Sequence, residues 1–143
     1  MKIALGADHG GFELKEKIKK HLVEKKYEVL DLGTNSCDSV DYPEFGHAVG
    51  HAVADKKADF GIVVCGTGIG ISIAANKVPG VRAALCTNTT MVKLTREHNN
   101  ANVLAMGGRI IGDVVALEMV DAFLNTDFQG GRHEKRINKI ENI

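Results

Sequence analysis

Apolar and polar residues follow one another along this chain in blocks that predict strands and helices in turn. Short runs of aliphatic and β-branched residues, typical of buried parallel strands, occupy residues 2–7, 28–32, 60–65, 81–86 and 103–106. Between them, apolar residues recur three or four positions apart, as in amphipathic helices, over residues 12–26, 71–77, 89–98 and 114–124 and after Tyr42-Pro43. This alternation predicts an α/β fold, a single three-layer α/β/α domain with a five-stranded parallel, Rossmann-like sheet.

The last segment departs from this pattern. The pair Gly130-Gly131 separates this segment from the last predicted helix, and Arg132 and Arg136 follow one helical turn apart. We therefore expect residues 1–143 to form one domain, in which 130–143 is a C-terminal tail outside the core. The two arginines are either solvated or form a fork that binds a phosphate or a carboxylate.

Charge and cysteine content argue against several classes of function. The chain of 143 residues has 18 basic and 18 acidic side chains and no dense basic stripe, which disfavours nucleic-acid binding. No apolar run approaches the ~20 residues of a membrane span, and residues 1–5 are typical of a strand, not of a signal peptide. Cys37, Cys65 and Cys86 form no C-x-x-C pair, which argues against disulfides or a zinc site and favours a reducing cytoplasm.

Residues 61–72, GIVVCGTGIGIS, carry the strongest chemical signal. An apolar strand ends in Cys65, a glycine-rich loop over residues 66–70 follows at once, and a helix comes next. The free amides and the dipole at a helix start, together with loop amides, form a cradle for an anion. A thiol at its rim is either a reactive group, because the cradle favours thiolate, or one of the many buried cysteines that are inert.

Three known phosphate-binding loops do not fit this segment. A P-loop requires a Lys-Ser/Thr pair after its last glycine, where Ile71-Ser72 stands. The dinucleotide motif G-x-G-x-x-G differs in spacing from Gly66-x-Gly68-x-Gly70, and no acid follows about 20 residues later. A thiol-phosphatase loop would have an arginine where Ile71 stands. The loop is therefore expected to hold an oxyanion without a nucleotide.

Two further strand-to-helix loops carry titratable groups. Asp8 and His9 lie between glycines after the first strand, and Arg109 follows Gly107-Gly108 after the fifth. Ligands of open α/β sheets bind beyond the carboxyl ends of the strands, so these groups are candidates for one site with Cys65. The alternatives are a helix cap for Asp8 and a solvated charge for Arg109.

Histidines supply two more candidates. His98 ends the helix predicted over 89–98, where it either takes part in chemistry or is only stabilised by the helix dipole. Glu44, His47 and His51 have a helical spacing that suits a metal, but they form no H-E-x-x-H motif, and the outer face of a helix needs polar residues in any case. We therefore predict no metal site.

Five segments taken together resemble one known family. They are GADHGG (6–11), DYP (41–43), CGTGIGISIAANK (65–77), REHN (96–99) and GGRH (130–133). In this order, and over nearly the whole chain, they resemble ribose-5-phosphate isomerase B, whose wider family includes galactose-6-phosphate and allose-6-phosphate isomerases. The resemblance implies that a sugar phosphate is interconverted between aldose and ketose through a cis-enediolate, without metal or cofactor. It also implies a homodimer with shared active sites, or a tetramer built from such dimers.

The resemblance also implies a role for each candidate. Cys65 matches the base that moves the proton, and His98 matches the acid/base that opens the sugar ring. Another branch of the family lacks this cysteine and uses a glutamate where Ile71 stands, so this chain resembles the cysteine branch. The remaining matches contact the sugar, the enediolate oxygens or the phosphate: Asp8, His9, the loop Gly66, Thr67, Gly68, Ile69 and Gly70, Asn99, Arg109, Arg132 and Arg136.

Two other interpretations stay open. An allose- or galactose-6-phosphate isomerase would use the same base and loop, but galactose-6-phosphate isomerases assemble from two different subunits, whereas this chain carries every expected group. A non-catalytic sugar-phosphate binding module with Cys65 as a redox sensor is the alternative from another class of function. The presence of Cys65, His98 and Asp8 together argues against it.

Overall fold

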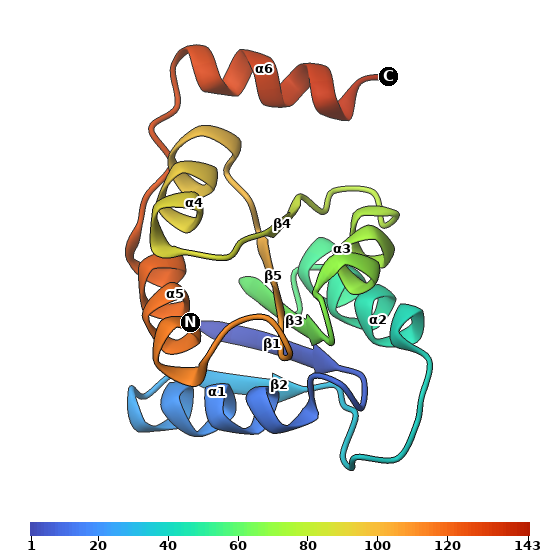
Figure 1. Cartoon of the computed structure of the whole chain (residues 1–143). Coiled ribbons are helices and arrows are strands. Elements are labelled where there is room, and N and C mark those ends of the chain that lie inside the picture. The colour runs from blue at the N-terminus through green and yellow to red at the C-terminus, as the bar shows by residue number, and fades with distance from the viewer.

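The computed structural model describes all 143 residues and confirms the predicted alternation of strands and helices (Figure 1). The strands are β1 (Lys2–Ala7), β2 (Glu28–Asp31), β3 (Phe60–Cys65), β4 (Ala83–Leu85) and β5 (Val103–Gly107). The α-helices are α1 (Phe12–Glu24), α2 (Tyr42–Ala54), α3 (Ile69–Asn76), α4 (Thr89–Leu94), α5 (Asp113–Asn125) and α6 (Arg132–Glu141). A π-helical turn, η1 (Thr95–Asn99), continues α4 directly.

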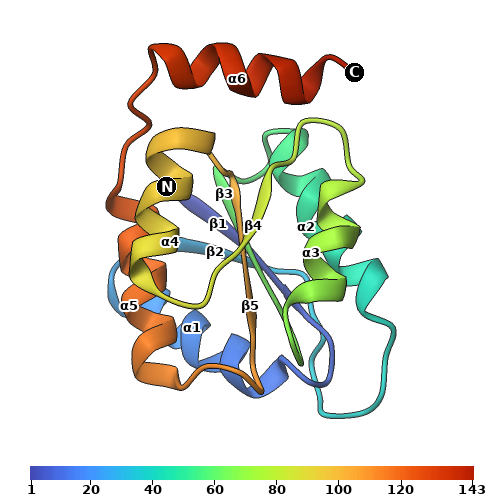
Figure 2. The same cartoon turned by 45° about the horizontal axis from the view of Figure 1, so that its top comes forward.

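The strands form one parallel sheet in the order β2-β1-β3-β5-β4, with α1, α4 and α5 on one face and α2 and α3 on the other (Figure 2). Successive side chains of β3 enter opposite cores: Ile62 and Val64 pack below α1 and α5, whereas Val63 and Cys65 pack below α2 and α3. Since both faces are covered, the strand is apolar throughout and shows no alternation. None of the helices combines the length and apolar character that crossing a membrane requires.

Several helix boundaries differ from the predicted ones. α1 ends at Glu24, shortly before Lys26 adopts a left-handed backbone with a φ of 70°. The helix predicted over 89–98 is α-helical only to Leu94 and then widens into η1, which apolar spacing does not distinguish from a regular helix. The C-terminal tail contains α6, which lies apart from both helical layers and packs on η1 (Figure 1). Only two residues of α6 are buried, so its sequence has no apolar stripe that predicts it.

A buried ion pair joins α1 to the edge strand β2. The ammonium of Lys15, a residue only 1% exposed, donates to Asp31 at 2.9 Å and to Glu16 at 2.8 Å. Burial of the Asp31 carboxyl opposes its ionisation, but hydrogen bonds from Lys15, from the Gly33 amide and from Lys19 outweigh burial and lower its pKa. The charged form of this carboxyl therefore stabilises the fold.

We expect Asp31→Asn to lower the free energy of unfolding by about 3 kcal/mol, because it leaves a buried ammonium without its main counter-charge. Glu16→Gln removes the more exposed partner of the same ammonium and should cost less than about 1 kcal/mol.

Since the pKa of Asp31 is lower in the folded than in the unfolded chain, the stability that this carboxyl contributes is present above about pH 4 and is lost as the pH falls further. Urea unfolding at pH 7 and pH 3 measures both effects, and an Asp31→Asn penalty that persists unchanged at pH 3 would contradict them.

Candidate active site

Three loops meet at the carboxyl end of the sheet. β1, β3 and β5 are neighbours, their register pairs Cys65 with Gly107, and Asp8 follows the end of β1 alongside. The N–H of Gly108 donates to the Cys65 carbonyl oxygen at 2.8 Å and ties two of these loops together. The strand order reverses next to β1, which is where open α/β sheets bind their ligands.

Glycines allow these loops to pack backbone against backbone. A Cβ atom at Gly107 would lie 2.6 Å from the carbonyl oxygen of Thr67, and one at Gly108 would lie 2.7 Å from that of Gly10. Both neighbours are backbone atoms and cannot swing aside as a flexible side chain can. A side chain at either glycine would therefore separate the loops that form the site.

Cys65 is held at the rim of the glycine loop. The residue is 5% exposed, and its Sγ accepts the N–H of Gly68 at 3.1 Å. Gly68 precedes α3 with a φ of 80°, a conformation that favours glycine, and a Cβ there would lie 2.6 Å from the backbone of Met106. The Gly68 hydrogen bond therefore fixes the Cys65 sulfur at the start of α3, beside the loop.

The loop amides divide into two groups. Those of Gly68 and Ile69 are used inside the loop, the first by the Cys65 sulfur and the second by Thr67 Oγ1 at 3.1 Å. Four others donate to no acceptor within the protein: Gly66, Thr67, Gly70 and Ile71. Neighbouring free N–H groups at a helix start are suited to an oxyanion. These four amides, rather than all of residues 66–70, are the candidates for binding one.

Asp8, His9 and Arg109 border the same end of the sheet. Asp8 is buried, and its Oδ1 accepts the N–H of Gly11 at 3.1 Å, so it braces the turn before α1. His9 Nδ1 accepts the N–H of Val40 at 3.2 Å, which assigns the proton of a neutral ring to Nε2. His9 and the exposed Arg109 both line a cavity of about 270 Å³. No three His, Cys, Asp or Glu side chains gather closely enough to hold a metal ion.

Four of the predicted residues lie at the opposite end of the sheet: His98, Asn99, Arg132 and Arg136. His98 belongs to η1, which precedes β5, whereas the last residue of β5, Gly107, is paired with Cys65. Arg132 and Arg136 are in α6, which crosses the end of the sheet where the strands begin (Figure 2). Within one chain the predicted residues therefore form two separate groups, one around Cys65 and one around His98.

Two residues to which the sequence analysis gave no role hold the His98 group together. His133 of α6 is 7% exposed, and its ring stacks on that of His98, with centroids 4.3 Å apart and planes 16° from parallel. Arg96 is 6% exposed, and its guanidinium lies 4.9 Å from the centre of the Phe60 ring and donates to the Ala101 carbonyl oxygen at 2.7 Å. Arginines in helical patterns are mostly solvated charges, so no sequence signal predicts that Arg96 anchors η1.

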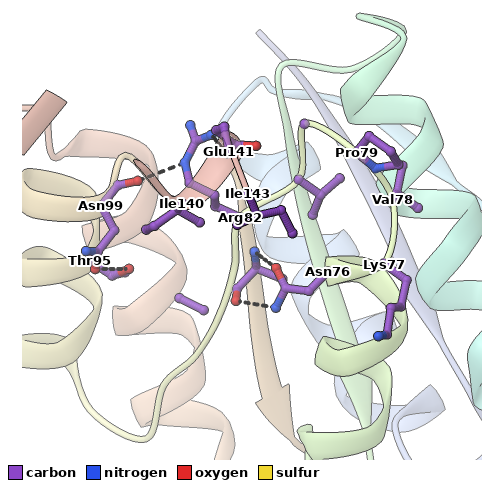
Figure 3. Close-up of a pocket in the computed structure, with 14 residues that line it drawn as sticks. Asn76, Lys77, Val78, Pro79, Arg82, Thr95, Asn99, Ile140, Glu141 and Ile143 are labelled. Carbon is purple, nitrogen blue, oxygen red and sulfur yellow. Dashed lines mark hydrogen bonds and ion pairs between the residues drawn. The ribbon is translucent and has the colours of Figure 1, made fainter. Parts of the chain in front are cut away.

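A cavity of about 650 Å³ also lies at this end, between α6 and the segment 77–84 (Figure 3). Arg82 bridges the two sides, since it donates to Glu141 of α6 at 2.6 Å and to the Asn99 carbonyl oxygen at 2.9 Å. The cavity borders the His98 group through Thr95 and Asn99 and includes none of the residues around Cys65.

Comparison with known proteins decides the family. Residues 3–140 match the family model described as Ribose/Galactose Isomerase. The chain belongs to this family. It is 49% identical to ribose-5-phosphate isomerase B of Escherichia coli K12 over 142 residues, which cover 99% of this chain and 95% of the relative.

Solved structures of the ribose/galactose isomerase family share the fold. The Clostridium thermocellum ribose-5-phosphate isomerase B has a TM-score of 0.98 and 56% identity, over 99% of this chain and 95% of that one. The Mycoplasma genitalium enzyme, solved with bound ribulose-5-phosphate, has a TM-score of 0.94 and 44% identity, over 98% of this chain and 93% of that one. The resemblance predicted from five sequence segments is therefore confirmed, as is the α/β fold.

Proposed function

We propose that this protein is an aldose–ketose isomerase that interconverts ribose 5-phosphate and ribulose 5-phosphate. The observation that carries the proposal is the Cys65 sulfur, which the Gly68 amide holds beside a row of free loop amides. A base next to an oxyanion cradle is what an enediolate mechanism requires. The E. coli relative is named for this activity, and the M. genitalium structure has ribulose-5-phosphate bound.

The cradle and the sulfur act in the same step. In the open-chain aldose, the Cys65 thiolate takes the proton from C2, and the electrons of the C2–H bond move through C1 to the carbonyl oxygen O1. The loop amides donate to the oxygens of the resulting cis-enediolate, and each such donor typically contributes on the order of 10²–10³ in rate. The sulfur then returns the proton to C1, the hydroxyl proton of O2 passes to O1, and the ketose is complete.

Ring opening and phosphate binding require further groups. Sugar phosphates are mostly cyclic, so an acid/base must open the ring before C2 reacts, and the imidazole of His98 suits this at neutral pH, with Asp8 beside the sugar. Arg132 and Arg136 lie one helical turn apart and, with Arg109, supply the charge that holds a phosphate dianion, to which His9 donates through Nε2.

The separation of the two groups of residues supports a homodimer, or a tetramer built from it. We propose that the partner subunit's His98 and α6 lie against the Cys65 end of each protomer, so that two subunits complete each site. Exposed apolar residues flank the edge strand β4 and suit such an interface: Ile69 and Ile73 on α3, and Met91 and Leu94 on α4.

Turnover assays with three substrates test the proposed function. We expect the protein to isomerise ribose 5-phosphate with a higher kcat/KM than allose 6-phosphate or galactose 6-phosphate. A higher kcat/KM for either six-carbon substrate would leave the isomerase mechanism in place but make that sugar phosphate the preferred substrate. Saturable binding of all three without turnover of any would replace the isomerase with a sugar-phosphate binding module.

A further inference from the structure

His133 is a buried titratable side chain for which the proposed mechanism has no role. It lies between Arg132 and Arg136 on the first turns of α6, yet those arginines are exposed, whereas His133 is 7% exposed. Its ring makes no hydrogen bond to another side chain or to the backbone. The contact that occupies it is the parallel stack on His98, at 4.3 Å between ring centroids.

This stack lies in the contact between α6 and η1. His98 belongs to η1, a wide turn that leaves its side chain half-exposed, and α6 packs against the body of the protein mainly through η1. Ile137 is the other buried residue of α6 and lies one turn further along the helix. Docking of α6 could rest on apolar residues alone, so a buried imidazole at position 133 calls for a separate explanation.

We infer that His133 is a positioning residue that holds the His98 imidazole in the plane and orientation needed for ring opening. The inference rests on the proposed function of His98. A stacked ring restricts rotation of its neighbour about the side-chain bonds, and a catalytic group that is displaced by about 1 Å can lose up to about 10²-fold in rate.

The charges around the stack favour the neutral form of its buried ring, His133. Burial lowers the pKa of His133, and the nearby His98, Arg132 and Arg136 lower it further, against the opposing effect of Glu97. These are the charged groups that face His133 from α6 and from η1. Because the His133 ring is neutral, His98 can take up a proton without a second positive charge stacked on its ring.

Two substitutions at position 133 separate stacking from docking. His133→Leu fills the buried position on α6 with an apolar side chain but removes the aromatic ring. We expect kcat for ribose 5-phosphate to fall by about tenfold, with KM changed by less than about twofold. His133→Phe restores a flat ring and should restore most of kcat. Ile137→Ala is the matched control, since it loosens α6 without touching the stack and should act mainly on KM through Arg132 and Arg136. A rise in KM without a loss of kcat in His133→Leu would overturn the inference and make His133 a phosphate ligand.

A double-mutant cycle separates this inference from the role proposed for His98. If His133 acts through His98, the His133→Leu effect on kcat should disappear in a His98→Asn background. An equal loss in both backgrounds would overturn the inference and leave the role of His98 intact. Full turnover by His98→Asn alone would instead remove His98 from the mechanism, and with it the function that His133 serves. The NMR signals of the His98 ring protons check the stack itself, because they must shift when the His133 ring is removed.

Discussion

Replacing Cys65 with alanine should reduce kcat for ribose 5-phosphate by about 10³-fold, while the variant still folds and binds the substrate. The sulfur is the only group at the rim of the cradle that is proposed to move a proton between carbon atoms. The loop amides, His9 and Arg109 remain in the variant and still bind the sugar phosphate. Turnover measured by formation of ribulose 5-phosphate, together with calorimetric titration of the inactive variant, distinguishes lost chemistry from lost binding.

Two control variants sharpen this experiment. Cys65→Ser keeps an acceptor for the Gly68 amide, so a similar loss of kcat in that variant reflects the weaker base rather than a collapsed loop. Cys86→Ala should keep its turnover, because Cys86 lies in the other core and burial raises the pKa of its thiol to about 11. Normal kcat in Cys65→Ser would exclude Cys65 as the base.

Mixing two inactive variants should restore activity if each site is built from two subunits. Cys65→Ala damages one end of the sheet and His98→Asn the other, so each homodimer has a lesion in both of its sites. In a mixed dimer one site receives both lesions and the other receives none. Equal mixing with free subunit exchange should therefore recover about a quarter of the wild-type activity.

The matched control uses two lesions at the same end of the sheet. Asp8 and Cys65 lie in the same half of each proposed site. In a mixed dimer of Asp8→Asn and Cys65→Ala, each site therefore has one lesion, and no activity should be recovered. A site contained within one chain predicts no recovery for either mixture, and this result would exclude the shared site. Recovery in both mixtures would point to contamination or to partial activity of one variant.

The strands of this fold are predictable from sequence because burial on both faces makes each of them a short apolar run. Their order is not, since it depends on which strand edges pair, and apolar runs such as 60–65 and 103–106 are equivalent in this respect. The short α6 escaped prediction because only His133 and Ile137 of its ten residues are buried. Its position is fixed by tertiary contacts with η1, which carry no local signature.

The same distinction applies to the site. Cys65 and its loop are contiguous in the chain, so strand, glycines and helix start together identify the cradle. Sequence could not show that the N–H groups of Gly68 and Ile69 donate to acceptors inside the loop, because these hydrogen bonds depend on a φ of 80° at Gly68. The place of His98 at the other end of the sheet does follow from a parallel sheet, because His98 comes just before β5 whereas Cys65 ends β3.

The placement of the two groups of residues at opposite ends of the sheet bears on how such an enzyme can diverge after gene duplication. If each site is shared between two subunits, as proposed, one of two duplicated copies can lose the Cys65 end and the other the His98 end, and their heterodimer still contains one intact site. Each end is then free to change under separate selection. A paired arrangement of two different subunits, as in the galactose-6-phosphate isomerases, is therefore within reach of this architecture through loss of function alone.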